Sequence, residues 1–73
     1  MTHFIIDIYN NNTKEIAREA LKFEGDLQTV RTFTLSIIKR LQLQDATGYI
    51  YERNGYRLGD IHITKVNYTN LKR

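Results

Sequence analysis

The sequence predicts an α+β fold of order ββαββ, in which a four-stranded antiparallel sheet carries one helix on one face. Three observations predict this fold. Runs of β-branched and aromatic residues, typical of strands, lie near both ends of the chain. A pattern of apolar residues with a period of about 3.6, typical of a helix, lies between them. Asparagine-containing segments follow the strand-like runs, as in hairpin turns.

Residues 3–9 are mostly β-branched or aromatic and end at an asparagine-rich turn, so we expect a strand. Alternate residues of a strand point to opposite faces of its sheet. Apolar side chains occur on both faces here: Phe4, Ile6 and Ile8 on one, and Ile5 and Tyr9 on the other. A strand that is apolar on both faces is usually central, so we expect this strand in the middle of the sheet.

Residues 14–24 fit two interpretations. As a helix, they would begin with a capping box of Asn12 and Glu15 and end at Gly25. As a strand, they would give residues 3–9 a neighbour across the asparagine turn. We prefer the strand. The alternative is the order βααββ, with a smaller sheet.

Residues 26–43 show the clearest helical pattern. Asp26 is a favourable N-cap, and Lys39 and Arg40 lie near the other end, where the helix dipole favours cations. Six residues fall within about 100° of arc on a helix and predict the side that packs on the sheet. These are Leu27, Val30, Thr34, Ile37, Ile38 and Leu41.

Residues 48–64 are expected to form a hairpin, because Asn54-Gly55 is the strongest short-range signal for a two-residue turn. That turn would set Arg53 opposite Tyr56, Glu52 opposite Arg57 and Tyr51 opposite Leu58. The last strand would run from Tyr56 to Thr64. We therefore expect a single domain over residues 1–64 and a basic C-terminal tail over residues 65–73.

The composition excludes several classes of protein. The 73 residues include no cysteine, so there is no disulfide framework and no thiolate zinc site. The longest apolar run, Phe4 to Ile6, is far too short to span a membrane, and the N-terminus lacks the pattern of a signal peptide. We expect a small cytoplasmic protein without a cofactor.

The sequence does not favour an enzyme. The single serine, Ser36, lies inside the predicted helix, and no glycine-rich phosphate loop occurs. His3, His62 and an aspartate (Asp7 or Asp60) would approach one another only if the first and last strands paired. We expect ordinary strand histidines and no metal site.

One face of the sheet is expected to remain uncovered, because a single helix covers only one. Its candidate contact residues are Ile5, Tyr9, Tyr49, Tyr51, Arg53 and Tyr56. Aromatic and arginine side chains supply most of the binding energy at protein interfaces. We therefore expect a non-enzymatic module that binds a protein partner, or a homodimer in which a second copy covers this face.

A nucleic-acid-binding accessory protein is the alternative, with the same tyrosines stacking on bases. Its phosphate contacts would come from Lys65, Lys72 and Arg73. The net charge is +3, but Lys72 and Arg73 supply two of these charges, so the rest of the chain carries only +1. This balance makes nucleic acid the second choice.

The overall pattern resembles short uncharacterised proteins encoded by phages and prophages. The pattern consists of a strand, the turn Asn10-Asn11-Asn12, a charged strand, a helix and an Asn54-Gly55 hairpin. The resemblance covers most of the chain but involves no family signature, so it transfers no functional residue. It implies a small accessory protein that interacts with a host or acts in DNA metabolism.

Overall fold

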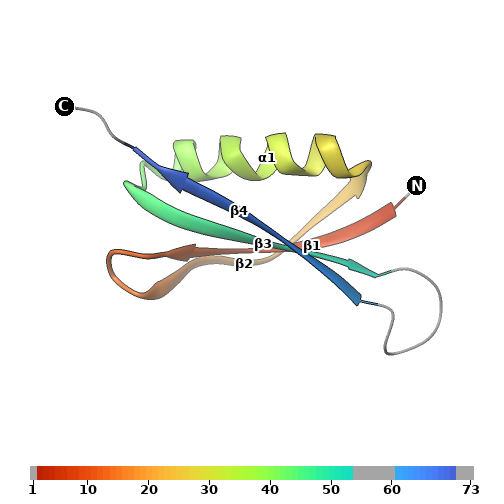
Figure 1. Ribbon diagram of the computed structural model, residues 1–73, viewed down its shortest axis with the longest axis horizontal. Coiled ribbons are helices and arrows are strands. Elements are labelled where there is room, and N and C mark those ends of the chain that lie inside the picture. The colour runs from red at the N-terminus through yellow and green to blue at the C-terminus, as the bar shows by residue number, and fades with distance from the viewer. Residues whose placement is uncertain (1, 54–60, 71–73) are drawn as a thin grey trace.

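The computed structural model describes residues 2–53 and 61–70. Four strands form one antiparallel sheet in the order β2-β1-β3-β4, and one helix lies across one face of it (Figure 1). The elements are β1 (Thr2–Asn10), β2 (Glu15–Gly25), α1 (Leu27–Arg40), β3 (Asp45–Arg53) and β4 (Ile61–Thr69). The predicted α+β fold of order ββαββ is confirmed, and β1 lies inside the sheet as expected.

The core lies between α1 and the sheet. Each of β1, β3 and β4 turns alternate residues toward the helix, and α1 supplies the opposite wall. The buried residues of this core are Phe4, Ile6 and Ile8 of β1, Val30, Thr34 and Ile38 of α1, Ala46 and Ile50 of β3, and Val66 of β4. The predicted alternation of β1 and the centre of the helical stripe thus account for most of the core.

Residues 15–25 form the strand β2, so the helical alternative for this segment is wrong. The asparagine turn is held by the Asn10 side chain, whose Oδ1 accepts hydrogen bonds from the backbone N–H of Asn12 (3.0 Å) and Thr13 (3.4 Å). The strand then places Leu21 and Phe23 against the core. Tertiary pairing with β1 therefore outweighs the local helical propensity.

Strand β2 is interrupted twice. Its pairing with β1 shifts between Ile6 and Ile8 and again between Ile8 and Tyr9, so β2 carries extra residues at both places. At the first shift Ala20 has a positive φ of 56°, and its N–H donates to Asp7 Oδ1 at 2.9 Å. Such bulges bend a strand and break the regularity of its edge.

Helix α1 begins where the sequence predicts. Asp26 is the N-cap, and its carboxylate accepts a hydrogen bond of 2.7 Å from the backbone N–H of Thr29. Hydrogen bonds from the side chain of Thr29 and from its backbone N–H lower the pKa of the Asp26 carboxyl below its ordinary value. The cap satisfies one of the free N–H groups of the first turn.

The helix ends at Arg40, three residues before the predicted end at residue 43. Gln42 follows the C-cap with a positive φ of 59°, and its N–H donates to the Lys39 carbonyl at 3.0 Å. The N–H of Leu43 donates to the Ile38 carbonyl at 3.4 Å. This pair of bonds is a Schellman motif, which stops a helix and usually places glycine where Gln42 stands.

Replacing Gln42 with glycine is expected to stabilise the fold by about 0.5–1 kcal/mol. Glycine adopts a positive φ without the steric penalty that a Cβ brings, and this gain exceeds its larger entropy loss on folding. Urea unfolding of Gln42→Gly measures the effect. Gln44→Gly is the control, because Gln44 has no positive φ and its replacement should only destabilise. Equal losses of stability in both variants would contradict the prediction.

The predicted register of the last hairpin is wrong. Tyr51 pairs with Ile63 rather than Leu58, and Glu52 pairs with His62 rather than Arg57. Arg53 pairs with Ile61, so residues 54–60 separate the two strands, and Asn54-Gly55 and Tyr56 lie outside the described residues.

Burial explains why the observed register is preferred. If the predicted register continued without a bulge and past Thr64, it would turn the odd-numbered residues toward α1, including Lys65. In the observed register Val66 lies opposite Gly48 and is buried, whereas Lys65 is exposed. A one-residue change of register exchanges the two faces of a strand, and burying valine rather than lysine is strongly favoured.

The last strand also extends further than predicted. We expected it to end at Thr64 and a tail to begin at residue 65, but β4 stays paired with β3 as far as the Asp45–Thr69 pair. Asn70 then donates its N–H to the Gln44 carbonyl at 2.7 Å. Lys65 is therefore a strand residue, while Lys72 and Arg73 lie outside the described residues.

Candidate binding face

The face of the sheet opposite α1, called the open face below, carries three rows of side chains across β1, β3 and β4. The strand register defines each row from the pairs of residues that lie opposite each other. The rows are Ile5–Tyr51–Ile63, Asp7–Tyr49–Lys65 and Tyr9–Thr47–Asn67. Each row mixes residues far apart in the chain, so the sheet assembles this surface.

The first row is apolar and aromatic. Ile5 is 38% exposed and Ile63 is 57% exposed, with the half-buried Tyr51 between them. Ile63 was not among the predicted contact residues. Its position follows only from the pairing of β4 with β3.

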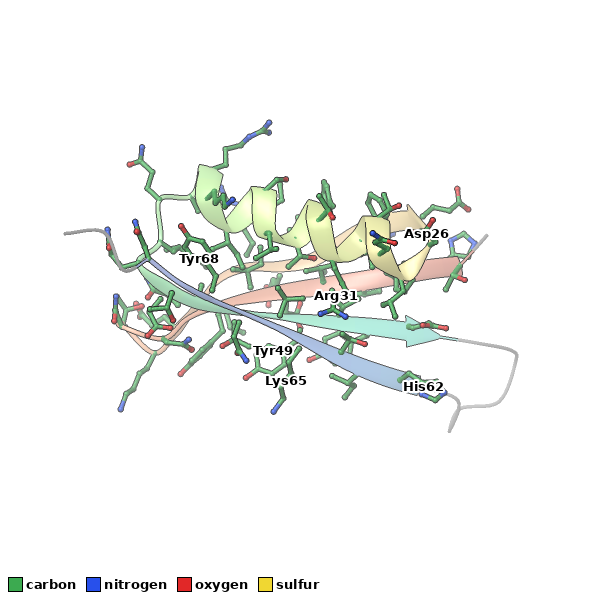
Figure 2. The ribbon with its side chains drawn as sticks, turned by 45° about the horizontal axis from the view of Figure 1, so that its top comes forward. Asp26, Arg31, Tyr49, His62, Lys65 and Tyr68 are labelled. Carbon is green, nitrogen blue, oxygen red and sulfur yellow. The ribbon has the colours of Figure 1, made fainter. Side chains whose placement is uncertain are left out.

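The second row brings a cation onto an aromatic ring. Lys65 lies opposite Tyr49, and its Nζ is 5.8 Å from the centroid of the Tyr49 ring. Figure 2 shows both side chains on the side of the sheet away from α1, while Tyr68 lies on the helix side. At an exposed site such a cation–π contact contributes about 0.5–1 kcal/mol. Lys65, predicted to be in a tail, is thus part of the open face.

Asp7 links the first two rows. Partial burial raises the pKa of the Tyr51 hydroxyl, and the negative charge of Asp7, the neighbouring Tyr49 and a hydrogen bond to Asp7 raise it further. The same carboxylate accepts the N–H of Ala20. Asp7 therefore holds both the tyrosine and the bulge of β2 in place.

Asp7→Asn is expected to lower the pKa of Tyr51 toward its ordinary value, because it removes the charge but keeps an acceptor for Ala20. The tyrosinate absorbance of the protein, minus that of Tyr51→Phe, measures this pKa. Since folding raises it, the contribution to stability is complete below about pH 10 and is lost as the pH rises through the folded value. Asp45→Asn on the same face is the control. Equal shifts in both variants would contradict a specific effect of Asp7.

The third row ends in a polar network. Asn11 Nδ2 donates to Asp45 Oδ1 (2.8 Å) and to Thr47 Oγ1 (3.1 Å). Thr47 Oγ1 lies 3.2 Å from Asn67 Oδ1, to which it donates in turn. Tyr9 lies in the same row. These polar groups bond to one another, so the exposed apolar surface at this end of the face comes from Tyr9 and from Ile16 of β2, which lies opposite Tyr9 and is 56% exposed.

The structure places four of the six predicted contact residues, Ile5, Tyr9, Tyr49 and Tyr51, on the open face. Arg53 closes strand β3, but its side chain lies outside the described part, as does Tyr56. Ile63 and Lys65 lie on the face of β4 opposite to that of the buried Val66, and this alternation is visible in the sequence. Only the correct register shows which of the two faces is the open one.

The two histidines do not come together. Strand β3 lies between β1 and β4, and His3 and His62 fall on opposite faces of the sheet. His3 Nε2 instead lies 3.4 Å from Glu24 Oε2. Residues 2–53 and 61–70 contain no group of three or more side chains suited to hold a metal ion. Asp60 lies outside these ranges.

In the described part of the chain, no helix is long and apolar enough to cross a membrane. No protein-family model, no curated protein and no solved structure matches the sequence or the fold. The chemistry of the open face is therefore the basis for a functional assignment.

Proposed function

We propose that this protein is a small, non-enzymatic binding module whose open face binds a protein partner. The observation that best supports this proposal is the row Ile5–Tyr51–Ile63, with Tyr49 beside it, on the face of the sheet that α1 does not cover. Contiguous exposed apolar surface on a small protein usually marks an interaction site. Tyrosine adds a large contact area at a small cost in conformational entropy.

The charges of the open face favour a protein over a polyanion. Lys65 and Lys22 flank the apolar row, but Asp7 lies between Tyr49 and the bulge of β2, and Glu24 lies beside His3. A mixed set of charges suits a protein surface with its own mixed charges. Phosphate backbones would be repelled by the two carboxylates.

Capture from a lysate of the source organism tests the proposal. We expect tagged wild-type protein to retain one partner after nuclease treatment and in moderate salt, and Ile63→Asp to lose it. Leu27→Asp is the matched control, because Leu27 is a 40% exposed apolar residue on α1 and its replacement leaves the open face unchanged. Retention of the partner by Ile63→Asp, or its loss on nuclease treatment, would overturn the proposal.

A nucleic-acid-binding role remains the second candidate, and the Tyr49–Lys65 pair is the observation that favours it. An aromatic ring beside a cation can stack on a base and contact a phosphate. This role predicts binding to single-stranded oligonucleotides with an affinity that falls steeply as salt increases. Fluorescence anisotropy of a labelled oligonucleotide measures it, and affinity that is unchanged by salt would exclude it.

A further inference from the structure

The two edges of the sheet differ sharply. The outer strand β2 carries five charged residues among its eleven, together with two register shifts and the positive φ of Ala20. The charged residues are Glu15, Arg18, Glu19, Lys22 and Glu24. Charges and bulges are the devices by which proteins prevent an edge strand from pairing with another chain. Strand β2 is therefore a protected edge.

The other edge, β4, has much less of this protection. Its nine residues pair with β3 one for one without a register shift, and Lys65 is its single lysine, arginine, aspartate or glutamate. Within residues 2–53 and 61–70, only β3 is hydrogen-bonded to β4 in the sheet. A regular strand rich in β-branched residues, with one edge unpaired, is a template for another strand.

We propose that a second copy of this chain pairs with β4, so that two antiparallel β4 strands join two sheets into one of eight strands. Opposite residues of antiparallel strands share a face, so the two-fold axis must pass midway between the two copies of one residue, which then lie opposite each other. An axis at Lys65 would oppose the two lysines. An axis at Val66 sets Lys65 opposite Asn67, Thr64 opposite Tyr68 and Ile63 opposite Thr69.

The register centred on Val66 is more complementary than those centred on Lys65 or Thr64. It pairs Lys65 with the polar Asn67 on the open face and an aromatic with a β-branched residue on the helix side, and it places the two Val66 residues together. An axis at Thr64 would instead oppose Lys65 to Ile63 and His62 to Val66. In the preferred register both helices lie on one side of the joined sheet, because the axis is perpendicular to it. This pairing uses the edge and leaves the open face free, so it is independent of the proposed function.

Two substitutions at one position test the dimer and its register. In the dimer, Asn67→Glu places a carboxylate opposite Lys65 of the other copy, and this happens twice because of the two-fold symmetry. Asn67→Lys instead places a second lysine opposite Lys65 at the same two positions. We expect the first to strengthen and the second to weaken dimerisation by about 2- to 30-fold each, at low salt. Both variants lose the same hydrogen bond from Thr47, so their cost to the fold is matched. Sedimentation equilibrium measures the dissociation constants.

Combining Lys65→Glu with Asn67→Lys should restore dimerisation, because it reverses both charges across the interface. In the wild type, hydrogen exchange of alternate β4 amides should slow as protein concentration rises, which tests the interface without any substitution. A monomer at all concentrations, or equal effects of Asn67→Glu and Asn67→Lys, would overturn the proposal. Loss of partner capture in Ile5→Asp with unchanged dimerisation would separate this outcome from the test of the open face, because Ile5 lies on β1 and not on the β4 edge.

Discussion

Ile6→Ala is expected to destabilise the protein by about 2–5 kcal/mol, the range for removing a fully buried isoleucine side chain. Ile6 is completely buried and lies between Leu21 of β2 and Ile50 of β3 in the sheet register. A domain of this length has a total stability of roughly 4–11 kcal/mol. The single substitution should therefore remove a large fraction of the stability.

Its neighbour Ile5 provides the matched control. Ile5 lies on the opposite face of the same strand and is 38% exposed, so Ile5→Ala should cost only about 1–2 kcal/mol. If the open face binds a partner, Ile5→Ala should weaken that binding while the protein stays folded. Urea unfolding and partner capture measure the two effects. Similar losses of stability in both variants would contradict the assignment of the two faces.

Gly48→Ala is expected to destabilise the fold by about 1–3 kcal/mol, although alanine is a better strand residue than glycine. A Cβ at position 48 would overlap Cγ2 of Thr34, and it would lie 3.8 Å from the Val66 carbonyl oxygen. Thr34 cannot turn away easily, because it is buried and its Oγ1 donates to the Val30 carbonyl at 2.7 Å. The missing side chain of Gly48 thus lets α1 approach the sheet closely.

Thr34→Ser tests this explanation directly. Serine lacks Cγ2 but keeps the hydroxyl that bonds to Val30, so it makes room for a Cβ at position 48. Alone it should cost about 1 kcal/mol for the lost methyl group. In Gly48→Ala/Thr34→Ser the two losses should largely cancel, which a double-mutant cycle of urea unfolding measures. Additive losses would show that the overlap is not the cause.

Local patterns were sufficient for the elements whose partners lie nearby in the chain. The N-terminus of α1 follows from the side chain of Asp26, which bonds within its own first turn. The two faces of β1 follow from the alternation of its side chains, with Ile6 on one face and Ile5 on the other. Apolar residues on both faces predicted that β1 lies inside the sheet, and this prediction is confirmed.

Tertiary structure decided the features that depend on distant partners. Residues 15–25 carry a helical propensity, and pairing with β1 made them a strand. The Asn54-Gly55 turn predicted a register that, continued unchanged to position 65, would have turned Lys65 toward α1. The helix imposed another register by burying Val66 opposite Gly48, and this moved Ile63 and Lys65 onto the open face.

The sequence by itself therefore determined the order of elements, the faces of β1 and four residues of the open face. The tertiary structure decided which residues of β4 join them. The physical reason is that side chains of a strand alternate with a period of two. A shift of the register by one residue therefore moves every side chain of the strand to the other face of the sheet. Burial beneath a helix that comes from the middle of the chain selects between the two registers, and no short-range signal in β4 contains that information.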